Sequence, residues 1–274
     1  MGDRHLSAGY RNRSACRWLL ALLCAGAPCT SAAAEEMVLF DGGAAPTIVH
    51  QDDTTARLAA ELLARDLSAL TGRTPDLATD AARCTVTCII IGQHDAPLIS
   101  GLARGAAMAD LAGRWEQYRR TTFVDAAGRR ILLIAGSDPR GTVWGVIDLT
   151  RELGISAWEW WADVTPQRVS RLAVDAAPRL SAEPSVRYRG IFLNDEDWGL
   201  QPWAADTYEP ETGDIGPKTY ARIFELMWRL KANTIWPAMH DSTKPFWQIP
   251  GNAAVARDHA IVLGTSHAEP MNRN

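Results

Sequence analysis

Three apolar, strand-like runs in the C-terminal third of the chain each end in a group of polar side chains. The runs and the polar groups that follow them are 189–193 and 194–197, 233–239 and 240–241, and 261–264 and 265–269. Helical patterns separate the runs, which is the βαβαβ order of parallel strands. Ligands bind at the carboxyl ends of strands in barrels and open α/β sheets. The pattern therefore predicts an α/β fold with an enzyme site at the strand ends.

The first 34 residues have the pattern of a signal peptide. Four arginines precede a short apolar run at residues 18–27, and Ala32-Ala33-Ala34 before Glu35 fits cleavage at small residues. The apolar run is shorter than the roughly 20 residues of a membrane-spanning helix. We expect a periplasmic or secreted protein; an uncleaved helix that anchors the chain is the alternative.

The charge balance argues against a nucleic-acid partner. Removal of residues 1–34 lowers Lys and Arg from 28 to 24 and Asp and Glu from 32 to 31, which leaves a net charge of −7. Nucleic acids select basic surfaces. An anionic substrate stays compatible with this balance, because the local field at a site matters more than net charge. We expect no membrane partner after cleavage.

Only two of the five cysteines, Cys84 and Cys88, lie outside the predicted signal peptide. They fall in an apolar run that predicts a strand over residues 84–91. Four extended residues span roughly 13 Å, which exceeds the Cα spacing of a disulfide. The pattern therefore predicts no bridge, unless this segment is a loop.

Residues 35–180 alternate between strand and helix patterns, which predicts an N-terminal α/β sandwich domain. Asp53 caps a predicted helix that runs to Leu70, and Asp138 caps a second that runs to Leu153. The remaining expectations are a hairpin of 118–124 and 130–135 turning at Gly128, a strand at 155–161, and a Pro- and Ala-rich linker or crossover at 171–188.

Residues 181–274 form a predicted second domain, the start of a (β/α)8 barrel. A helix opens at Pro217, and its sheet-facing side is predicted to carry Tyr220, Ile223, Phe224, Met227 and Leu230. A shorter helix is predicted at 252–258. Three parallel strands with an open edge make a poor independent core. We therefore expect the first three βα units of a barrel, and a chain that is a fragment.

Glu209 and Glu211 are candidates for a general acid. They lie in a loop with Pro210 and Gly213, and a carboxylate on a loop over a barrel mouth can protonate a leaving group. Solvated surface charges are the alternative for both.

The strand-end groups supply candidates for substrate binding. Successive side chains of an extended segment point in opposite directions, so at most two of residues 194–197 face one pocket. Trp198 and Trp203 can stack on sugar rings or pack in the core. Lys244 can pair with a substrate carboxylate or stay solvated.

Four residues, His240, Asp241, His267 and Glu269, could ligate a metal. Their spacing matches no short metal motif, and hydrogen bonding to substrate hydroxyls needs the same residue types. We predict no metal and no other cofactor.

These segments resemble glycoside hydrolase family 115, the xylan α-1,2-glucuronidases. The resemblance rests on 189–204 (RGIFLNDEDWGLQPWA), 213–240 (GDIGPKTYARIFELMWRLKANTIWPAMH), 244–252 (KPFWQIPGN) and 264–274 (GTSHAEPMNRN), with 136–154 (GSDPRGTVWGVIDLTRELG) and 158–166 (WEWWADVTP) in the first domain. The similarity covers most of residues 35–274.

The resemblance implies inverting hydrolysis of (4-O-methyl-)glucuronic acid side chains of xylan, which uses a general acid and a general base. It implies an acidic loop residue, Glu209 or Glu211, of which we choose Glu209. It implies a substrate pocket, for which the residues are Asn194, Asp195, Trp198, His240, Lys244, His267 and Glu269, with Arg273 as a second cation. We expect the general base beyond residue 274 and therefore an inactive fragment.

The expected partners are glucuronoxylan or oligosaccharides derived from it. A homodimer of the full-length enzyme is left open. Two other functions compete with the glucuronidase: a non-catalytic carbohydrate-binding module, and a metal-dependent hydrolase that uses the histidines.

Overall fold

The computed structural model describes residues 35–102, 105–195, 197–266 and 269–272. The predicted signal peptide, residues 1–34, lies outside this range. Within it, no helix is long and apolar enough to cross a membrane.

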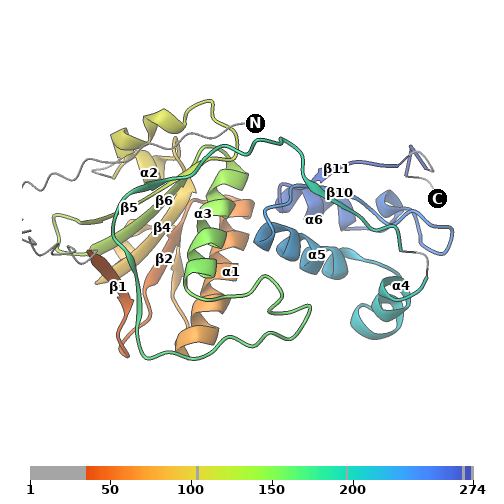
Figure 1. Cartoon of the computed structure of the whole chain (residues 1–274), viewed down its shortest axis with the longest axis horizontal. Coiled ribbons are helices and arrows are strands. Elements are labelled where there is room, and N and C mark those ends of the chain that lie inside the picture. Colours follow the sequence, from red (N-terminus) through yellow and green to blue (C-terminus); the bar gives the residue numbers. More distant parts are fainter. Residues whose placement is uncertain (1–34, 103–104, 196, 267–268, 273–274) are drawn as a thin grey trace, which may run out of the picture. The chain divides into compact units, whose positions relative to one another are not determined.

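A six-stranded sheet forms the centre of the N-terminal part (Figure 1). Its strands, in spatial order, are β3 (Leu77–Ala78), β2 (Thr47–His50), β4 (Thr87–Gln93), β6 (Arg130–Gly136), β5 (Tyr118–Val124) and β8 (Arg179–Leu180). The first four run parallel, while β5 is antiparallel to β6 and to β8. The predicted mixed α/β fold is confirmed.

Both faces of this sheet are covered. Helices α1 (Thr54–Thr71) and α3 (Pro139–Glu152) pack on one face, where Ile89 and Ile91 of β4 point. The short helices α2 (Pro97–Ser100) and η2 (Gly105–Leu111) cover the other face, with Cys88 and Ile90. Alternate residues of β4 thus enter different cores, which explains why the strand is apolar throughout.

Local sequence signals set the ends of both long helices as predicted. Asp53 accepts a hydrogen bond from the Ala56 amide at 3.0 Å, and α1 ends at Gly72 with φ +69°. Asp138 accepts from the Gly141 amide at 2.7 Å, and Pro139 occupies the first turn of α3. The hairpin of β5 and β6 is also confirmed.

Two predictions about the N-terminal part are wrong. Residues 155–161 form no strand, because successive turns return the main chain and the Ala162 amide bonds to the Trp158 carbonyl at 3.0 Å. The segment 171–188, predicted as a linker or crossover without strands of its own, contains two strands. One is β7 (Leu172–Asp175), which pairs with β1 (Glu36–Phe40), and the other is β8.

Cys84 and Cys88 form a disulfide, contrary to the prediction. Cys84 ends the short helix η1 (Ala81–Arg83), and β4 begins only at Thr87. The intervening chain is therefore not fully extended, and the two Cα atoms lie 5.8 Å apart, within disulfide reach.

The C-terminal part contains the three parallel strands predicted from the sequence. They are β9 (Gly190–Phe192), β10 (Thr234–Trp236) and β11 (Val262–Leu263), with β10 in the centre. Helix α5 (Pro217–Arg229) lies between β9 and β10 along the chain, and α6 (Asn252–Asp258) precedes β11. The shorter elements are α4 (Leu200–Trp203), the π-helix η3 (Ala204–Tyr208) and η4 (Phe246–Gln248). The complete barrel stays a prediction.

Helix α5 buries four of the five residues predicted on its apolar side, namely Tyr220, Ile223, Phe224 and Met227. Leu230 is the exception, with 48% of its surface exposed. The prediction for Leu230 is wrong because the helix ends at Arg229, so the helical spacing no longer sets the direction of the Leu230 side chain.

Glycine is required where β9 approaches β10. A Cβ atom added to Gly190 would lie 1.5 Å from the Thr234 carbonyl oxygen, so Gly190→Ala must push the two strands apart. We expect this variant to lower the free energy of unfolding by about 3 kcal/mol, measured by urea denaturation. Gly199→Ala is the control, because an added Cβ meets nothing within 4 Å there. Equal stability of the two variants would contradict this packing.

Candidate functional site

The loops that follow the three parallel strands lie next to one another. The Leu193 amide donates to the Trp236 carbonyl at 3.0 Å, and the Gly264 amide donates to the Ile235 carbonyl at 2.9 Å. Beyond the strands, Ser266 Oγ lies 3.1 Å from Met239 Sδ. The structure thus gathers the predicted strand-end residues at one edge of the sheet.

The loop after β9 carries an exposed Asn194 and a half-buried Asp195. Asp195 Oδ2 accepts a hydrogen bond from the Gln201 amide at 2.9 Å, which ties the loop to α4. Trp198 is 85% exposed, so its ring is open to a ligand. Trp203 instead packs against aromatic neighbours and stacks on Tyr208 at 4.8 Å between ring centroids.

A buried phenol lies under the strand-end loops. Tyr220 is 2% exposed, and its hydroxyl accepts a hydrogen bond from the Ala238 amide at 3.3 Å. Burial raises the pKa of Tyr220 well above its ordinary value, and the charges of Asp214 and Asp195 raise it further. The hydroxyl therefore stays neutral and can only donate or accept a hydrogen bond. The sequence pattern had assigned Tyr220 to sheet packing alone.

Asp214 joins the loop before α5 to the loop after β10. Its side chain is 2% exposed and accepts hydrogen bonds from the amides of Ile215 at 2.7 Å and Lys244 at 2.8 Å. The Lys244 ammonium is exposed and donates to the Thr212 carbonyl at 3.3 Å. Sequence reasoning missed Asp214, although its place just before a helix signal at Pro217 marks it as a turn residue.

The remaining predicted ligand-binding residues are distributed along the same edge. His240 is exposed, and its Nδ1 lies 2.9 Å from Ser242 Oγ. Glu269 is half-buried and accepts from the Met271 amide at 3.0 Å. His267 and Arg273 lie outside the described residues. Among the residues that are described, no three His, Cys, Asp or Glu side chains are placed to hold a metal ion.

The two predicted acids differ in their surroundings. Glu209 is 1% exposed, and both of its carboxylate oxygens accept hydrogen bonds at the start of α5. The donors are Lys218 N at 3.1 Å and Thr212 Oγ1 at 3.2 Å to Oε1, and Thr219 N and Oγ1, each at 3.0 Å, to Oε2. Gly216, the residue before the helix, has no side chain to cap it, and Glu209 occupies that space.

Glu211 is exposed to solvent and pairs with the Lys218 ammonium. The hydrogen bond from Lys218 lowers the pKa of Glu211. Of the two acids, Glu211 is therefore the one whose carboxylate is open to solvent. A catalytic role for either residue stays a prediction.

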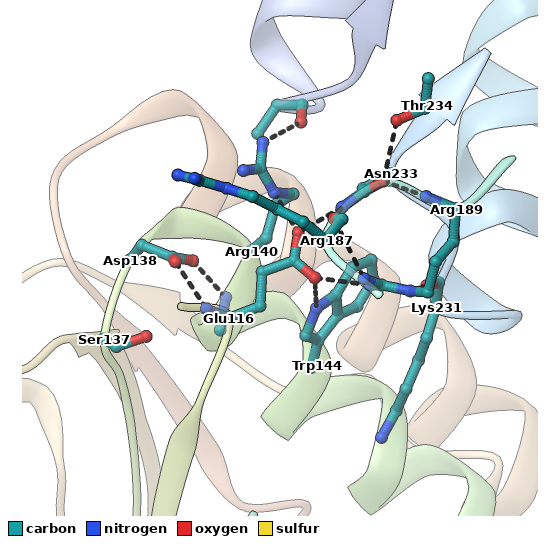
Figure 2. Close-up of polar contacts among 12 residues, drawn as sticks. Glu116, Ser137, Asp138, Arg140, Trp144, Arg187, Arg189, Lys231, Asn233 and Thr234 are labelled. Carbon is teal, nitrogen blue, oxygen red and sulfur yellow. Dashed lines mark hydrogen bonds and ion pairs between the residues drawn. The ribbon is translucent and has the colours of Figure 1, made fainter. Parts of the chain in front are cut away.

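A buried carboxylate holds the amino ends of β9 and β10 (Figure 2). Glu116 is 1% exposed. Its Oε1 accepts from Arg140 Nε at 2.5 Å and Asn233 Nδ2 at 2.6 Å, and its Oε2 accepts from Arg189 Nη2 at 2.5 Å and Trp144 Nε1 at 3.1 Å. Arg189 directly precedes β9 and Asn233 directly precedes β10, so one side chain sets where both strands begin.

The main chain at Glu116 is also constrained. Its φ is +52°, in the left-handed region that non-glycine residues seldom adopt. The Glu116 amide donates to Asp138 Oδ2 at 2.7 Å, and the cap residue of α3 thereby stabilises this conformation. No sequence motif marked Glu116, because its partners come from three separate segments: α3, the residue before β9 and the residue before β10.

A hollow of about 290 Å³ lies along β9 and β10, with Phe192 and Trp236 in its wall. It follows the uncovered face of the sheet rather than the strand-end loops. We place the candidate site at the strand ends instead, because the three loops that carry the predicted polar residues lie next to one another there.

Comparison with known proteins identifies the family. The model of glycosyl hydrolase family 115 matches residues 181–274. The solved structure of BtGH115A, a family 115 4-O-methyl-α-glucuronidase with specificity for decorated arabinogalactans, is 40% identical with a TM-score of 0.73. This match covers 86% of the present chain and 30% of that chain. The chain belongs to glycosyl hydrolase family 115.

A more distant structure shares the fold of this family 115 chain. The chitobiase of Flavobacterium johnsoniae is 12% identical with a TM-score of 0.51, over 84% of this chain and 32% of that one. No curated protein matches the chain significantly. The chain thus spans about a third of the length of the solved relatives named here.

Substitution separates the two loop acids of this family 115 chain. Glu209→Gln replaces an acceptor oxygen by a donor that faces the amides of α5, so we expect the free energy of unfolding to fall by about 2 kcal/mol. Glu211→Gln, at an exposed position, is the matched control and should leave the free energy of unfolding close to that of the wild type. Thermal and urea unfolding measure both. An unchanged stability of Glu209→Gln would contradict its role at the helix terminus.

Glu116 also gives the fold a pH dependence. Burial alone would raise the pKa of Glu116, but hydrogen bonds from Arg189, Asn233 and Trp144 outweigh it and hold that pKa below its ordinary value. Stability from a lowered pKa is present above the unfolded-state pKa of about 4.3 and is lost as pH falls through the folded-state value. We expect the wild-type melting temperature to fall as the pH drops below the unfolded-state pKa of about 4.3 and through the folded-state pKa of Glu116.

Glu116→Gln should remove that acid-dependent loss. At pH 7 the variant leaves the partly buried guanidinium groups of Arg140 and Arg189 without their counter-charge, and we expect a destabilisation of about 3 kcal/mol. Glu61→Gln, at a partly exposed ion pair with Arg57, should cost less than about 1 kcal/mol. Parallel pH profiles of wild type and Glu116→Gln would contradict the assignment.

Proposed function

We propose that this chain forms the sugar-positioning part of an exported glycoside hydrolase that removes (4-O-methyl-)glucuronic acid side chains from xylan by inverting hydrolysis. The observation that carries the proposal is the convergence of three parallel strand ends in a family 115 chain. Polar groups at this edge suit sugar hydroxyls, and Trp198 presents an open aromatic face. The related glucuronidase acts on decorated polysaccharides, which supports a uronic acid as the ligand.

We assign sugar binding to Asn194, Asp195, Trp198, His240, His267 and Glu269. Lys244 carries an exposed ammonium beside the loop of the candidate acids, where it can pair with the carboxylate of glucuronic acid. Inversion needs one carboxyl group as acid and another as base, with room for a water molecule between them. Glu211 is the candidate acid whose carboxylate is exposed to solvent. Glu209 joins the same loop to the start of α5 through hydrogen bonds from the amides of Lys218 and Thr219.

We propose the periplasm or the cell exterior as the location. The Cys84–Cys88 disulfide supports this, since disulfides persist in oxidising compartments and are rare in the cytosol. The arginine-rich, apolar start of the sequence is the second support.

Binding and hydrolysis are measured separately on the 274-residue chain. We expect calorimetry to detect binding of glucuronic acid to the chain. Lys244→Met should raise the dissociation constant for glucuronic acid about tenfold, because a charge-assisted hydrogen bond is lost. We expect little release of glucuronic acid from glucuronoxylan or decorated arabinogalactan, because we propose that the second catalytic carboxyl group lies outside this chain.

Arg57→Met is the control, since it removes one exposed positive charge from α1. If Lys244→Met and Arg57→Met lose the same affinity for glucuronic acid, the loss comes from the change in net charge and not from a contact with Lys244. Strong release of glucuronic acid by this chain would show that both catalytic groups are present in it. Binding of neutral oligosaccharides at the strand ends without glucuronic acid would favour a non-catalytic carbohydrate-binding module.

A further inference from the structure

A second hollow lies at the carboxyl edge of the six-stranded sheet, away from the three parallel strand ends. Its volume is about 610 Å³, and it is lined by the segments that directly follow β2 and β3 and by the start of α2 after β4. Pockets that bind small ligands have volumes of roughly 300–1,000 Å³. The size of this hollow therefore suits a small molecule.

The topology of the sheet places this hollow at a switch point. From β2 the chain passes through α1 on one face to β3, whereas from β4 it passes through α2 and η2 on the other face (Figure 1). Connections that leave two neighbouring strands on opposite faces open a crevice between the strand ends. Open α/β sheets bind their ligands in such crevices.

Gln51 spans the crevice between β2 and β4. The main-chain amide of Gln51 donates to the Ile91 carbonyl at 2.9 Å, and its side-chain Oε1 accepts from the main-chain amide of Gln93 at 2.7 Å. Gly92 makes room for this side chain, since a Cβ there would lie 3.1 Å from Gln51 Cβ. Within the described part of the chain, Gln51 Nε2 makes no hydrogen bond, so its two N–H groups remain for a ligand.

The rest of the lining combines acceptors with an aliphatic wall. Asp52, Thr79 and Asp80 are exposed at the rim, and Asp80 uses one oxygen to accept from the Ala82 amide at 2.8 Å. Pro97 and Leu98 form the apolar side. Hydroxyl-rich rings present both hydrogen-bonding edges and C–H faces, and this lining matches both.

The same lining disfavours charged ligands. No lysine or arginine occurs among the described residues that line the hollow, and the first turn of α1 is already capped by Asp53. An anion such as a uronic acid would meet two carboxylates and no cation. A metal ion would need more ligands, because no three His, Cys, Asp or Glu side chains of the described residues form a site.

We propose that this hollow binds a neutral saccharide, such as a stretch of the uncharged main chain of a polysaccharide. The N-terminal sheet then has a sugar site of its own, in addition to the strand-end site for glucuronic acid. The proposal rests on the lining of the hollow and stands whether or not the strand ends hydrolyse a glycosidic bond.

The test is a titration of the isotope-labelled 274-residue chain, followed by amide NMR shifts, with three separate probes: xylotetraose, glucuronic acid and calcium chloride. We expect xylotetraose to shift the amides of residues 51–52, 79–80, 96 and 98, and the other two probes to leave them unchanged. Asp52→Ala and Thr79→Val each remove the hydrogen-bonding group of one side chain at an exposed position. Each should raise the dissociation constant for xylotetraose about fivefold, the worth of one hydrogen bond.

Gln51→Glu keeps the acceptor for the Gln93 amide and removes the two free N–H groups, so it should weaken binding at least as much. Asp41→Asn, an exposed acid outside the hollow, is the control and should bind as the wild type does. The proposal is overturned if xylotetraose shifts only amides at the strand ends or none at all. It is also overturned if calcium or glucuronic acid produces the same shifts, or if the control weakens binding equally.

Discussion

The buried carboxylate of Glu116 is the contact on which the parallel sheet depends. Its four donors come from α3 and from the residues that precede β9 and β10. A buried charge that loses its partners costs several kcal/mol, so Arg189 and Asn233 must stay where Glu116 holds them. The pairing of Gly190 with Thr234 follows directly from that anchor, because each of these residues is the next one along its strand.

The position of the candidate site therefore depends on Glu116, which lies two residues before β5 of the N-terminal sheet. Strands of two or three residues have little register energy of their own, and an anchor at their amino ends also places their carboxyl ends. A second contact supports α5: Arg229 binds both oxygens of Asp66 on α1 at 2.9 Å. Burial opposes the charge on Arg229, but the hydrogen bonds and charge of Asp66 outweigh it and raise the pKa of Arg229.

The features that the sequence predicted correctly depend on neighbouring residues. Asp53 and Asp138 cap helices through amides three positions away, and the order of the three parallel strands follows from apolar runs. The disulfide, the turns at 155–161 and the contacts of Glu116 depend instead on tertiary structure. Cys84 and Cys88 meet only because β4 starts at Thr87, a boundary that an uninterrupted apolar run could not reveal.

Glu209 illustrates why a residue type and a loop position do not establish a catalytic acid. The sequence predicted a carboxylate over the mouth of a site. Glycine at position 216 instead leaves space for the Glu209 carboxylate at the start of α5, where a Cβ atom would lie 2.4 Å from Glu209 Oε1. Its carboxylate accepts hydrogen bonds from Thr212, Lys218 and Thr219, and reaching a substrate oxygen would require giving up some of them. Glu211, two residues later, can turn toward a ligand by giving up one solvent-exposed ion pair with Lys218, which contributes little to stability. Glu209 thus holds the shape of the loop and Glu211 is open to solvent, while the choice of the acid between them stays a prediction.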